Sequence, residues 1–179
     1  MRRGTRYVPP VIPLVRRRIA LVAAAASFLV GVPCSAGAIS GLVTLDGVAG
    51  VTPGMGSARV AELWGIARAR ADRPCSTVKF HVSDGNLNGY ALFLHGRLGA
   101  VFFTSGASTA TGLHIGTRKG RLRSLYGAQL RTVPGSSSYF LVRKKSPHWQ
   151  IRFDVSKGAV SLIGFGDETV HFVGSCGAR

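Results

Sequence analysis

The sequence predicts an α+β fold of two tandem modules, each with one short helix packed on a curved antiparallel meander. Two observations predict this fold. A glycine-bounded segment at residues 54–65 is echoed at residues 116–127, with every position shifted by 62. Each segment is followed by short alternating or apolar runs that turn residues separate, which is the pattern of hairpin-connected strands. Self-similarity at a fixed spacing indicates an internal duplication.

Each echoed segment is predicted to be a short helix. Its aliphatic and aromatic residues recur at i, i+3 and i+4, so they share one helix face. Gly65 and Gly127 then fit the C′ position, where a positive φ is needed. The alanine-rich stretch that follows also allows the first helix to continue to Ala71, before Pro74 stops it. The expected repeat core is Val60, Leu63 and Trp64 in the first copy and Leu122, Leu125 and Tyr126 in the second.

The strands are expected near residues 42–45, 77–83, 89–95 and 98–104 in the first module, and near 139–144, 148–155, 159–165 and 169–173 in the second. Alternation of polar and apolar residues over 77–83 predicts one wet face and one buried face. Residues 105–111 are small and polar, and we interpret them as the linker between the modules.

Residues 1–38 are predicted to be a signal peptide. Arg16, Arg17 and Arg18 precede an uncharged apolar run of 14 residues at 19–32, and small residues allow cleavage before Ile39. As a helix this run spans about 21 Å, less than the ~30 Å of a bilayer core, which disfavours an uncleaved anchor. Cleavage after Ala36, a twin-arginine route and lipid attachment at Cys34 are alternatives, although the residues before Cys34 fit a lipobox poorly.

The remaining chain is predicted to form one cooperative domain, with the first module at residues 39–110 and the second at 111–179. Six of the 23 basic residues lie within the first 38, so 17 remain against seven acidic residues, a net charge of +10. We expect the processed protein to be secreted or otherwise extracytoplasmic. Association with the cell envelope is the alternative localisation.

Two cysteines, Cys75 and Cys176, follow the signal peptide. An even number of cysteines in an oxidising compartment favours one disulfide. Two free thiols or a metal site are the alternatives, but no CxxC or HxxxH spacing occurs. We therefore expect a disulfide, no bound metal and no cofactor.

The sequence offers little material for catalysis. It contains no Gly-x-Ser-x-Gly motif and no glycine-rich phosphate loop, and its one adjacent carboxylate pair is Asp167 and Glu168. We assign no catalytic residue and predict a protein that is not an enzyme. A secreted hydrolase is the least favoured reading.

Basic residues give the strongest functional signal. Arg68, Arg70 and Arg73 follow the first helix. A surface of this charge favours anionic partners, while secretion makes nucleic acid an improbable natural one. The candidate surface for an anionic partner comprises Arg118, Lys119, Arg121, Arg123, Arg131, Arg143, Lys144 and Lys145.

The pattern Gly-Met-small-x-x-x-Val-x-x-Leu-Trp-Gly at 54–65, and its echo ending Leu-x-x-Leu-Tyr-Gly at 116–127, resembles the tandem modules of secreted β-lactamase-inhibitory proteins. It is also similar to the single modules of outer-membrane-assembly lipoproteins, and the composition suits a secreted actinobacterial protein. The resemblance covers residues 48–173 and implies a fold that binds other proteins. The inhibitors have a cysteine after each helix, whereas Cys75 has no counterpart near position 137.

These observations together predict a secreted, non-enzymatic protein that binds another protein through a basic surface. Inhibition of the bound protein is one form of this prediction. The alternative is a structural or surface-associated envelope protein that binds anionic wall polymers or lipid head groups. The partner itself, an extracellular protein or an anionic envelope polymer, is not identified by the sequence.

Overall fold

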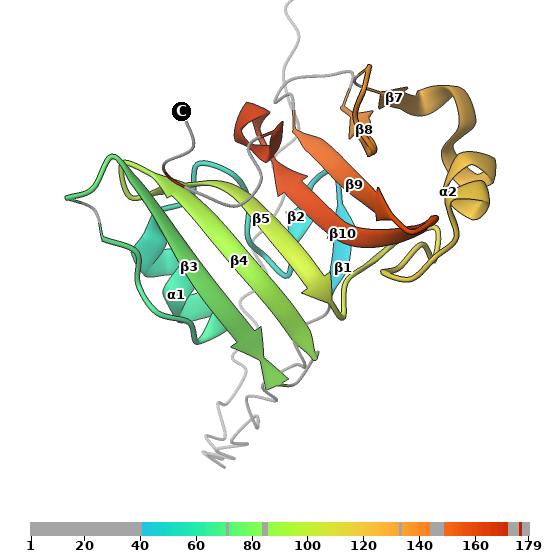
Figure 1. Cartoon of the computed structure of the whole chain (residues 1–179). Helices are drawn as coiled ribbons and strands as arrows, with labels where there is room; N and C mark the ends of the chain where they lie inside the picture. Colours follow the sequence, from blue (N-terminus) through green and yellow to red (C-terminus); the bar gives the residue numbers. More distant parts are fainter. Residues whose placement is uncertain are drawn as a thin grey trace, which may run out of the picture. The chain divides into compact units, whose positions relative to one another are not determined.

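The chain forms one large antiparallel sheet, seen in a computed structural model that describes residues 41–179 apart from 71, 84–85, 133, 144–148, 172–175 and 177–179 (Figure 1). The predicted signal peptide at 1–38 lies outside the described residues. Consecutive hairpins build each half of the sheet, and the two halves meet where β5 pairs with β10. The seven strands, in spatial order, are β3 (Cys75–Val82), β4 (Leu87–Leu94), β5 (Arg97–Ser105), β10 (Ala159–Gly166), β9 (Gln150–Ser156), β8 (Ser138–Val142) and β7 (Leu130–Thr132).

Shorter elements complete the described structure. A small sheet has the order β2-β1-β6, and two short α-helices precede the two hairpin sets. The described chain is thus mostly β-sheet with two short helices, in keeping with the predicted α+β class. These elements are β1 (Leu42–Thr44), β2 (Gly47–Val48), β6 (Ser108–Thr109), α1 (Ser57–Trp64), α2 (Lys119–Tyr126) and the 3₁₀ turns η2 (Gly127–Gln129) and η3 (Glu168–His171).

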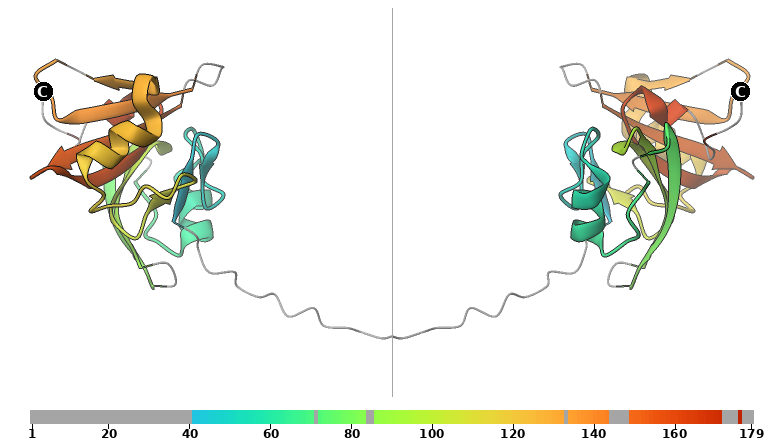
Figure 2. Two further views of the ribbon diagram at one scale, coloured as in Figure 1. Left: turned by 90° about the vertical axis from the view of Figure 1, so that its right-hand side faces the viewer. Right: turned by 90° about the vertical axis from the view of Figure 1, so that its left-hand side faces the viewer.

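Both helices bury their apolar residues in the larger core, against one face of the main sheet. In α1, the Trp64 ring lies 5.3 Å from the Phe80 ring in an edge-on arrangement, a geometry that aromatic pairs prefer. In α2, the Tyr126 ring stacks on Phe153 at 5.6 Å. Figure 2 shows α1 and the small sheet on the same side of the strands. Of the predicted repeat core, Val60, Trp64, Leu122 and Tyr126 are buried, and Leu63 and Leu125 pack half-buried at its margin.

A smaller apolar cluster lies on the opposite face of the sheet. Phe102, Phe140 and Leu162 belong to it, and Val170 of η3 packs onto them. Glycines at this face allow close approach: a Cβ at Gly99 would lie 2.5 Å from the Thr169 hydroxyl oxygen. The C-terminal turn η3 therefore sits directly on the sheet.

Backbone hydrogen bonds attach the start of each helix to the last hairpin of each half, and their residue numbers differ by 62. The turns of those hairpins match too, because His95-Gly96 and Lys157-Gly158 all have positive φ, as a type I′ turn requires. The first half has bonds from Gly54 N to Leu98 O, Leu98 N to Met55 O and Ser57 N to Gly96 O, and the second half has bonds from Gly116 N to Val160 O, Val160 N to Thr117 O and Lys119 N to Gly158 O.

Two local predictions were wrong, and a third segment is more structured than expected. The first helix does not continue toward Ala71, because Gly65 takes the left-handed conformation (φ 63°) and ends it at Trp64. Within residues 105–111, the segment interpreted as a linker, β6 pairs in parallel with β1. In place of a strand at 169–173, the described residues form the turn η3, and 172–173 lie outside the described residues.

Candidate functional site

The basic residues predicted to bind an anionic partner divide between several places. Lys119 and Arg123 on α2 approach one aromatic ring, with the charged groups 5.6 Å and 5.9 Å from the centre of Tyr139. Arg118 and Arg121 are exposed on or beside the same helix. These four cations form a surface that we call the α2 patch.

The remaining predicted cations do not join the α2 patch. Arg131 lies opposite Phe140 in the β7–β8 register, so its side chain belongs to the other face of the sheet. Arg143 forms an ion pair with Asp46 at 2.9 Å and lies over the Trp149 ring. Lys144 and Lys145 lie outside the described residues.

The α2 patch alters the acidity of the ring it surrounds. A hydrogen bond with Lys119, and then one with Arg123, lower the pKa of the Tyr139 phenol below its ordinary value, against the opposing effect of burial. On the other face, burial raises the pKa of the half-buried Tyr90 phenol. The surroundings of the two tyrosines therefore shift their pKa values in opposite directions.

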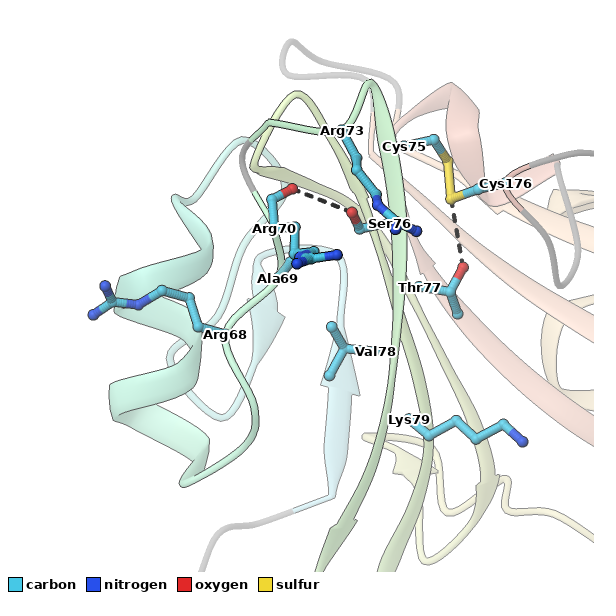
Figure 3. Close-up of a pocket in the computed structure, with 10 residues that line it drawn as sticks. All are labelled: Arg68, Ala69, Arg70, Arg73, Cys75, Ser76, Thr77, Val78, Lys79 and Cys176. Atoms are coloured by element: carbon cyan, nitrogen blue, oxygen red, sulfur yellow. Dashed lines mark hydrogen bonds between the residues drawn. A yellow bond between two sulfur atoms is a disulfide. The ribbon is translucent and has the colours of Figure 1, made fainter.

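A second basic surface lies at the edge of the sheet, around β3. It is a groove of about 570 Å³ between the chain that follows α1 and the first half of β3 (Figure 3). We call it the β3 groove. It is lined by Arg68, Ala69, Arg70, Arg73, Cys75, Ser76, Thr77, Val78, Lys79 and Cys176.

The β3 groove carries unneutralised positive charge. Three ion pairs form among the described residues, and Arg59, Arg143 and Arg152 are their cations. The four cations that line the groove belong to none of these pairs. Figure 3 shows the side chains of Arg70 and Arg73 beside β3, whereas Lys79 extends on the other side of the strand. Positive charge thus lies on both sides of the edge strand.

The groove exists because the chain after α1 stands away from β3. The Ser57 hydroxyl at the start of α1 donates a hydrogen bond to the carbonyl of Ala69 at 3.3 Å. Ala69 itself is buried in the core. Nearer the turn, the Ser76 hydroxyl donates to the carbonyl of Arg70 at 3.2 Å. Residues 68–70 are thereby held toward α1, and they belong to no strand.

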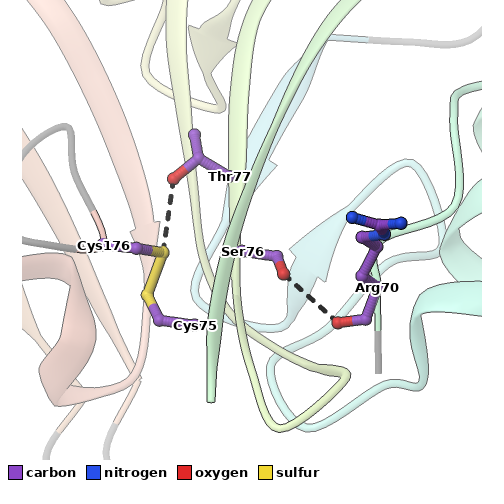
Figure 4. Close-up of a disulfide and its surroundings, with 5 residues drawn as sticks. All are labelled: Arg70, Cys75, Ser76, Thr77 and Cys176. Carbon is purple, nitrogen blue, oxygen red and sulfur yellow. Dashed lines mark hydrogen bonds between the residues drawn. A yellow bond between two sulfur atoms is a disulfide. The ribbon is translucent and has the colours of Figure 1, made fainter. Parts of the chain in front are cut away.

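The predicted disulfide between Cys75 and Cys176 is confirmed, with Cα atoms 5.3 Å apart. It joins the first residue of β3 to Cys176, and both cysteines line the β3 groove. The Thr77 hydroxyl lies 3.5 Å from the Cys176 sulfur. Figure 4 shows this contact on one side of β3 and the Ser76–Arg70 hydrogen bond on the other. A disulfide is compatible with an oxidising, extracytoplasmic compartment.

Arg152 forms the most connected polar cluster among the described residues, and its partners are structural. Its side chain donates to the Asp154 carboxylate at 2.6 Å, to the Ser138 hydroxyl and to the carbonyls of Val170 and His171. The guanidinium also lies over the Phe140 ring. Because its donors are used, Arg152 fastens η3 to the sheet and leaves little for a ligand.

The histidines do not assemble a reactive centre with one another in the described structure. His81 contacts the Asn88 side chain at 2.6 Å, and His171 contacts Gln150 at 3.0 Å. No group of three His, Cys, Asp or Glu side chains that could hold a metal ion occurs in the part of the chain that the structure describes. No helix there is long and apolar enough to cross a membrane.

Sequence reasoning noticed Arg68, Arg70 and Arg73 but did not place them at a sheet edge. The spacing Arg-Ala-Arg after a helix end was the available signal, because it puts a buried alanine between two outward arginines. Lys79 was expected only as a residue of the wet face. Their convergence on the open edge of β3 depends on how residues 68–70 are held.

Comparisons with known proteins give weak structural likenesses only. No family model and no curated protein matches the chain. A DUF4309 family protein from Bacillus subtilis is similar with a TM-score of 0.42 and 13% identity, over 63% of this chain and 78% of that one. A cysteine-rich secretory protein from Staphylococcus aureus has a TM-score of 0.41 and 14% identity, over 65% of this chain and 44% of that one. The protein yfeY from Escherichia coli has a TM-score of 0.36 and 15% identity, over 72% and 98% of the two chains. At these scores the neighbours carry no argument about fold or function.

Proposed function

We propose that this chain is a secreted, non-enzymatic binding protein that takes an acidic protein partner on its basic surface. The observation that carries the proposal is the β3 groove, whose lining includes four cations that belong to none of the ion pairs among the described residues. Clustered charge of one sign in a groove concentrates ligands of the opposite sign.

The proposal includes an architecture of two tandem modules, each a helix followed by a meander. The matched hydrogen bonds and matched hairpin turns at a spacing of 62 support it. They attach equivalent helix starts to equivalent strands, which a chance similarity of glycines would not do. The resemblance to tandem inhibitory proteins stays a prediction, and it concerns the fold rather than the target.

Binding of anionic probes by the oxidised protein tests the proposed function. Polyglutamate represents an acidic protein surface. We expect salt-sensitive binding of polyglutamate that the double variant Arg70→Glu/Arg73→Glu weakens at least tenfold, about 1.4 kcal/mol. The double variant Arg118→Glu/Arg121→Glu is the matched control, since it changes the net charge equally on the α2 patch. Absence of polyglutamate binding at low salt would refute the proposal.

A second candidate function is attachment to an anionic envelope polymer or to lipid head groups, and the α2 patch favours it. Four cations on or beside one short helix suit a partner with regularly repeated charge. The same assay with poly(glycerol phosphate) and with phosphatidylglycerol vesicles separates the two functions. Retention of these probes, lost in Arg118→Glu/Arg121→Glu and kept in Arg70→Glu/Arg73→Glu, would select the envelope function.

A further inference from the structure

Strand β3 is an eight-residue edge of the main sheet, and among the described strands it pairs only with β4. An edge strand presents unpaired backbone N–H and C=O groups to any chain that approaches in an extended conformation. Charged side chains commonly protect such edges, so Lys79 alone could be a simple safeguard. The β3 groove beside this strand indicates a role beyond protecting the edge from other chains.

The pairing pattern identifies which backbone groups face the open edge. The His95 amide donates to the Pro74 carbonyl at 2.9 Å, which makes these two residues a hydrogen-bonded pair at the base of the β3–β4 hairpin. Hydrogen-bonded and non-hydrogen-bonded pairs alternate along an antiparallel ladder. The backbone groups of Cys75, Thr77 and Lys79 therefore point outward, and all three residues are among those that line the β3 groove.

The second half of the protein shows what fills the equivalent place. There β7 pairs with β8 in the register Leu130–Leu141, Arg131–Phe140 and Thr132–Tyr139. The meanders match at a spacing of 62 in β4–β5 and β9–β10 but at 61 in β3 and β8, because Ser138 pairs with Asp154 whereas Thr77 pairs with Leu92. Tyr139 and Phe140 of β8 therefore correspond to Val78 and Lys79 of β3, while residues 130–132 of β7 correspond to residues 68–70. Residues 68–70 line one wall of the β3 groove, and Val78 and Lys79 line the other. The groove is the position of a strand that the second half possesses and the first half lacks.

The chain's own residues 68–70 are held out of that position. Ser57 holds the Ala69 carbonyl toward α1, and the position 62 residues later is Lys119, whose ammonium instead lies over Tyr139. The second half thus lacks this hydroxyl bond and forms β7, while the first half keeps its edge open.

The charges around the open edge define the chemistry of an occupant. Side chains of an added strand would alternate between the two faces of the sheet. Those on one face would meet Arg70 and Arg73, and those on the other would meet Lys79. Acidic residues suit both faces.

We propose that the β3 groove binds an extended acidic segment of a partner protein, which pairs with β3 as an additional strand. Backbone hydrogen bonds to the outward groups of Thr77 and Lys79 supply the pairing, and the groove cations select acidic sequences, the mode known as β-strand addition. This inference rests on the proposed function and specifies its partner.

An acidic peptide of alternating Glu and Thr residues tests the proposal on the full-length oxidised protein. Two further peptides carry N-methyl groups on one or the other alternate set of residues. Strand pairing uses the N–H groups of one set only, so we expect one methylated peptide to bind at least tenfold more weakly and the other to bind like the parent. Equal binding of both methylated peptides would overturn strand pairing and leave salt-sensitive acidic binding, and with it the proposed function, standing.

Protein variants provide the reciprocal test. Thr77→Pro removes an outward N–H, at a place where an edge strand tolerates proline, and Thr77→Val keeps that N–H. Both variants lose the Thr77 hydroxyl. We expect at least tenfold weaker peptide binding for Thr77→Pro alone. Parent-like binding by a folded Thr77→Pro variant would overturn the proposal. The proposal would also fail if the free protein were a dimer that Thr77→Pro dissociates, because β3 would then pair with a second copy of the chain.

Discussion

Arg152 and Arg143 each form an ion pair with a carboxylate, and the two pairs differ in burial. This difference decides how much each pair contributes to stability. Arg152 and Asp154 have side-chain exposures of 10% and 19%, whereas Asp46, the partner of Arg143, is 78% exposed. A partly exposed pair is screened by water and contributes little. A buried carboxylate that loses its partner keeps its desolvation cost.

We therefore expect Arg152→Met to lower the free energy of unfolding by about 3 to 5 kcal/mol, because Asp154 and two η3 carbonyls lose their donor. Arg143→Met is the matched control, with an expected loss of about 0 to 1 kcal/mol. Urea denaturation measures both. Equal losses in the two variants would show that Arg152 does not hold η3.

Tyr139 offers a titration test of the α2 patch. The Lys119 hydrogen bond lowers the pKa of the phenol, so the phenolate should appear at a lower pH than in an ordinary tyrosine. Lys119→Met removes the largest cause and is expected to move the titration to higher pH, while Lys79→Met should leave it in place. An ultraviolet pH titration, with Tyr139→Phe subtracted to assign the signal, measures this shift. An unchanged titration in Lys119→Met would contradict the described contact.

At the scale of elements, the disulfide ties the open edge strand β3 to the C-terminal segment. The bond closes a loop with a sequence separation of 101, and removing a native disulfide costs about 2 to 5 kcal/mol. We expect Cys75→Ser and Cys176→Ser to lower the thermal midpoint by similar amounts, and the double variant to lower it no further. Titratable thiols from both cysteines in the oxidised protein would refute the bond.

The elements also show how far sequence reasoning reaches. The two helices follow from local signals, since apolar spacing and the glycines at 65 and 127 act within a few residues. The turn η3 does not, because alternating residues at 169–173 favour a strand. Arg152 overrides this preference by donating to the carbonyls of Val170 and His171, which lie 18 and 19 positions later in the chain. Strand β7 was missed for the same reason, since its pairing depends on β8.

The candidate site was predictable only in part. The charge of Arg68, Arg70 and Arg73 is visible in the sequence, as is the spacing of 62. Whether residues 68–70 pair with β3 depends on one hydroxyl group, that of Ser57, and on the burial of Ala69. Neither is a property of the local sequence around β3.

At the scale of the molecule, the two halves share the β5–β10 pairing and one core. Each half contains one tryptophan: Trp64 packs on Phe80, and Trp149 packs on Phe165. The variants Trp64→Phe and Trp149→Phe each retain one tryptophan as a fluorescent reporter. We expect each variant to show the same unfolding midpoint by tryptophan fluorescence and by circular dichroism, as two-state unfolding requires. Separate midpoints for the fluorescence and the circular dichroism of one variant would mean that the halves unfold independently.

The central claim is that the open edge of β3 receives an acidic strand, and amide hydrogen exchange measured by NMR tests it most directly. In the free oxidised protein, the amides of Thr77 and Lys79 should exchange rapidly, while those of Val78 and Phe80, which face β4, should be protected. Saturation with the alternating Glu-Thr peptide should slow exchange at Thr77 and Lys79 and leave Val78 and Phe80 as they were. Slow exchange at Thr77 and Lys79 without peptide, or no change when the bound peptide is present, would contradict the claim.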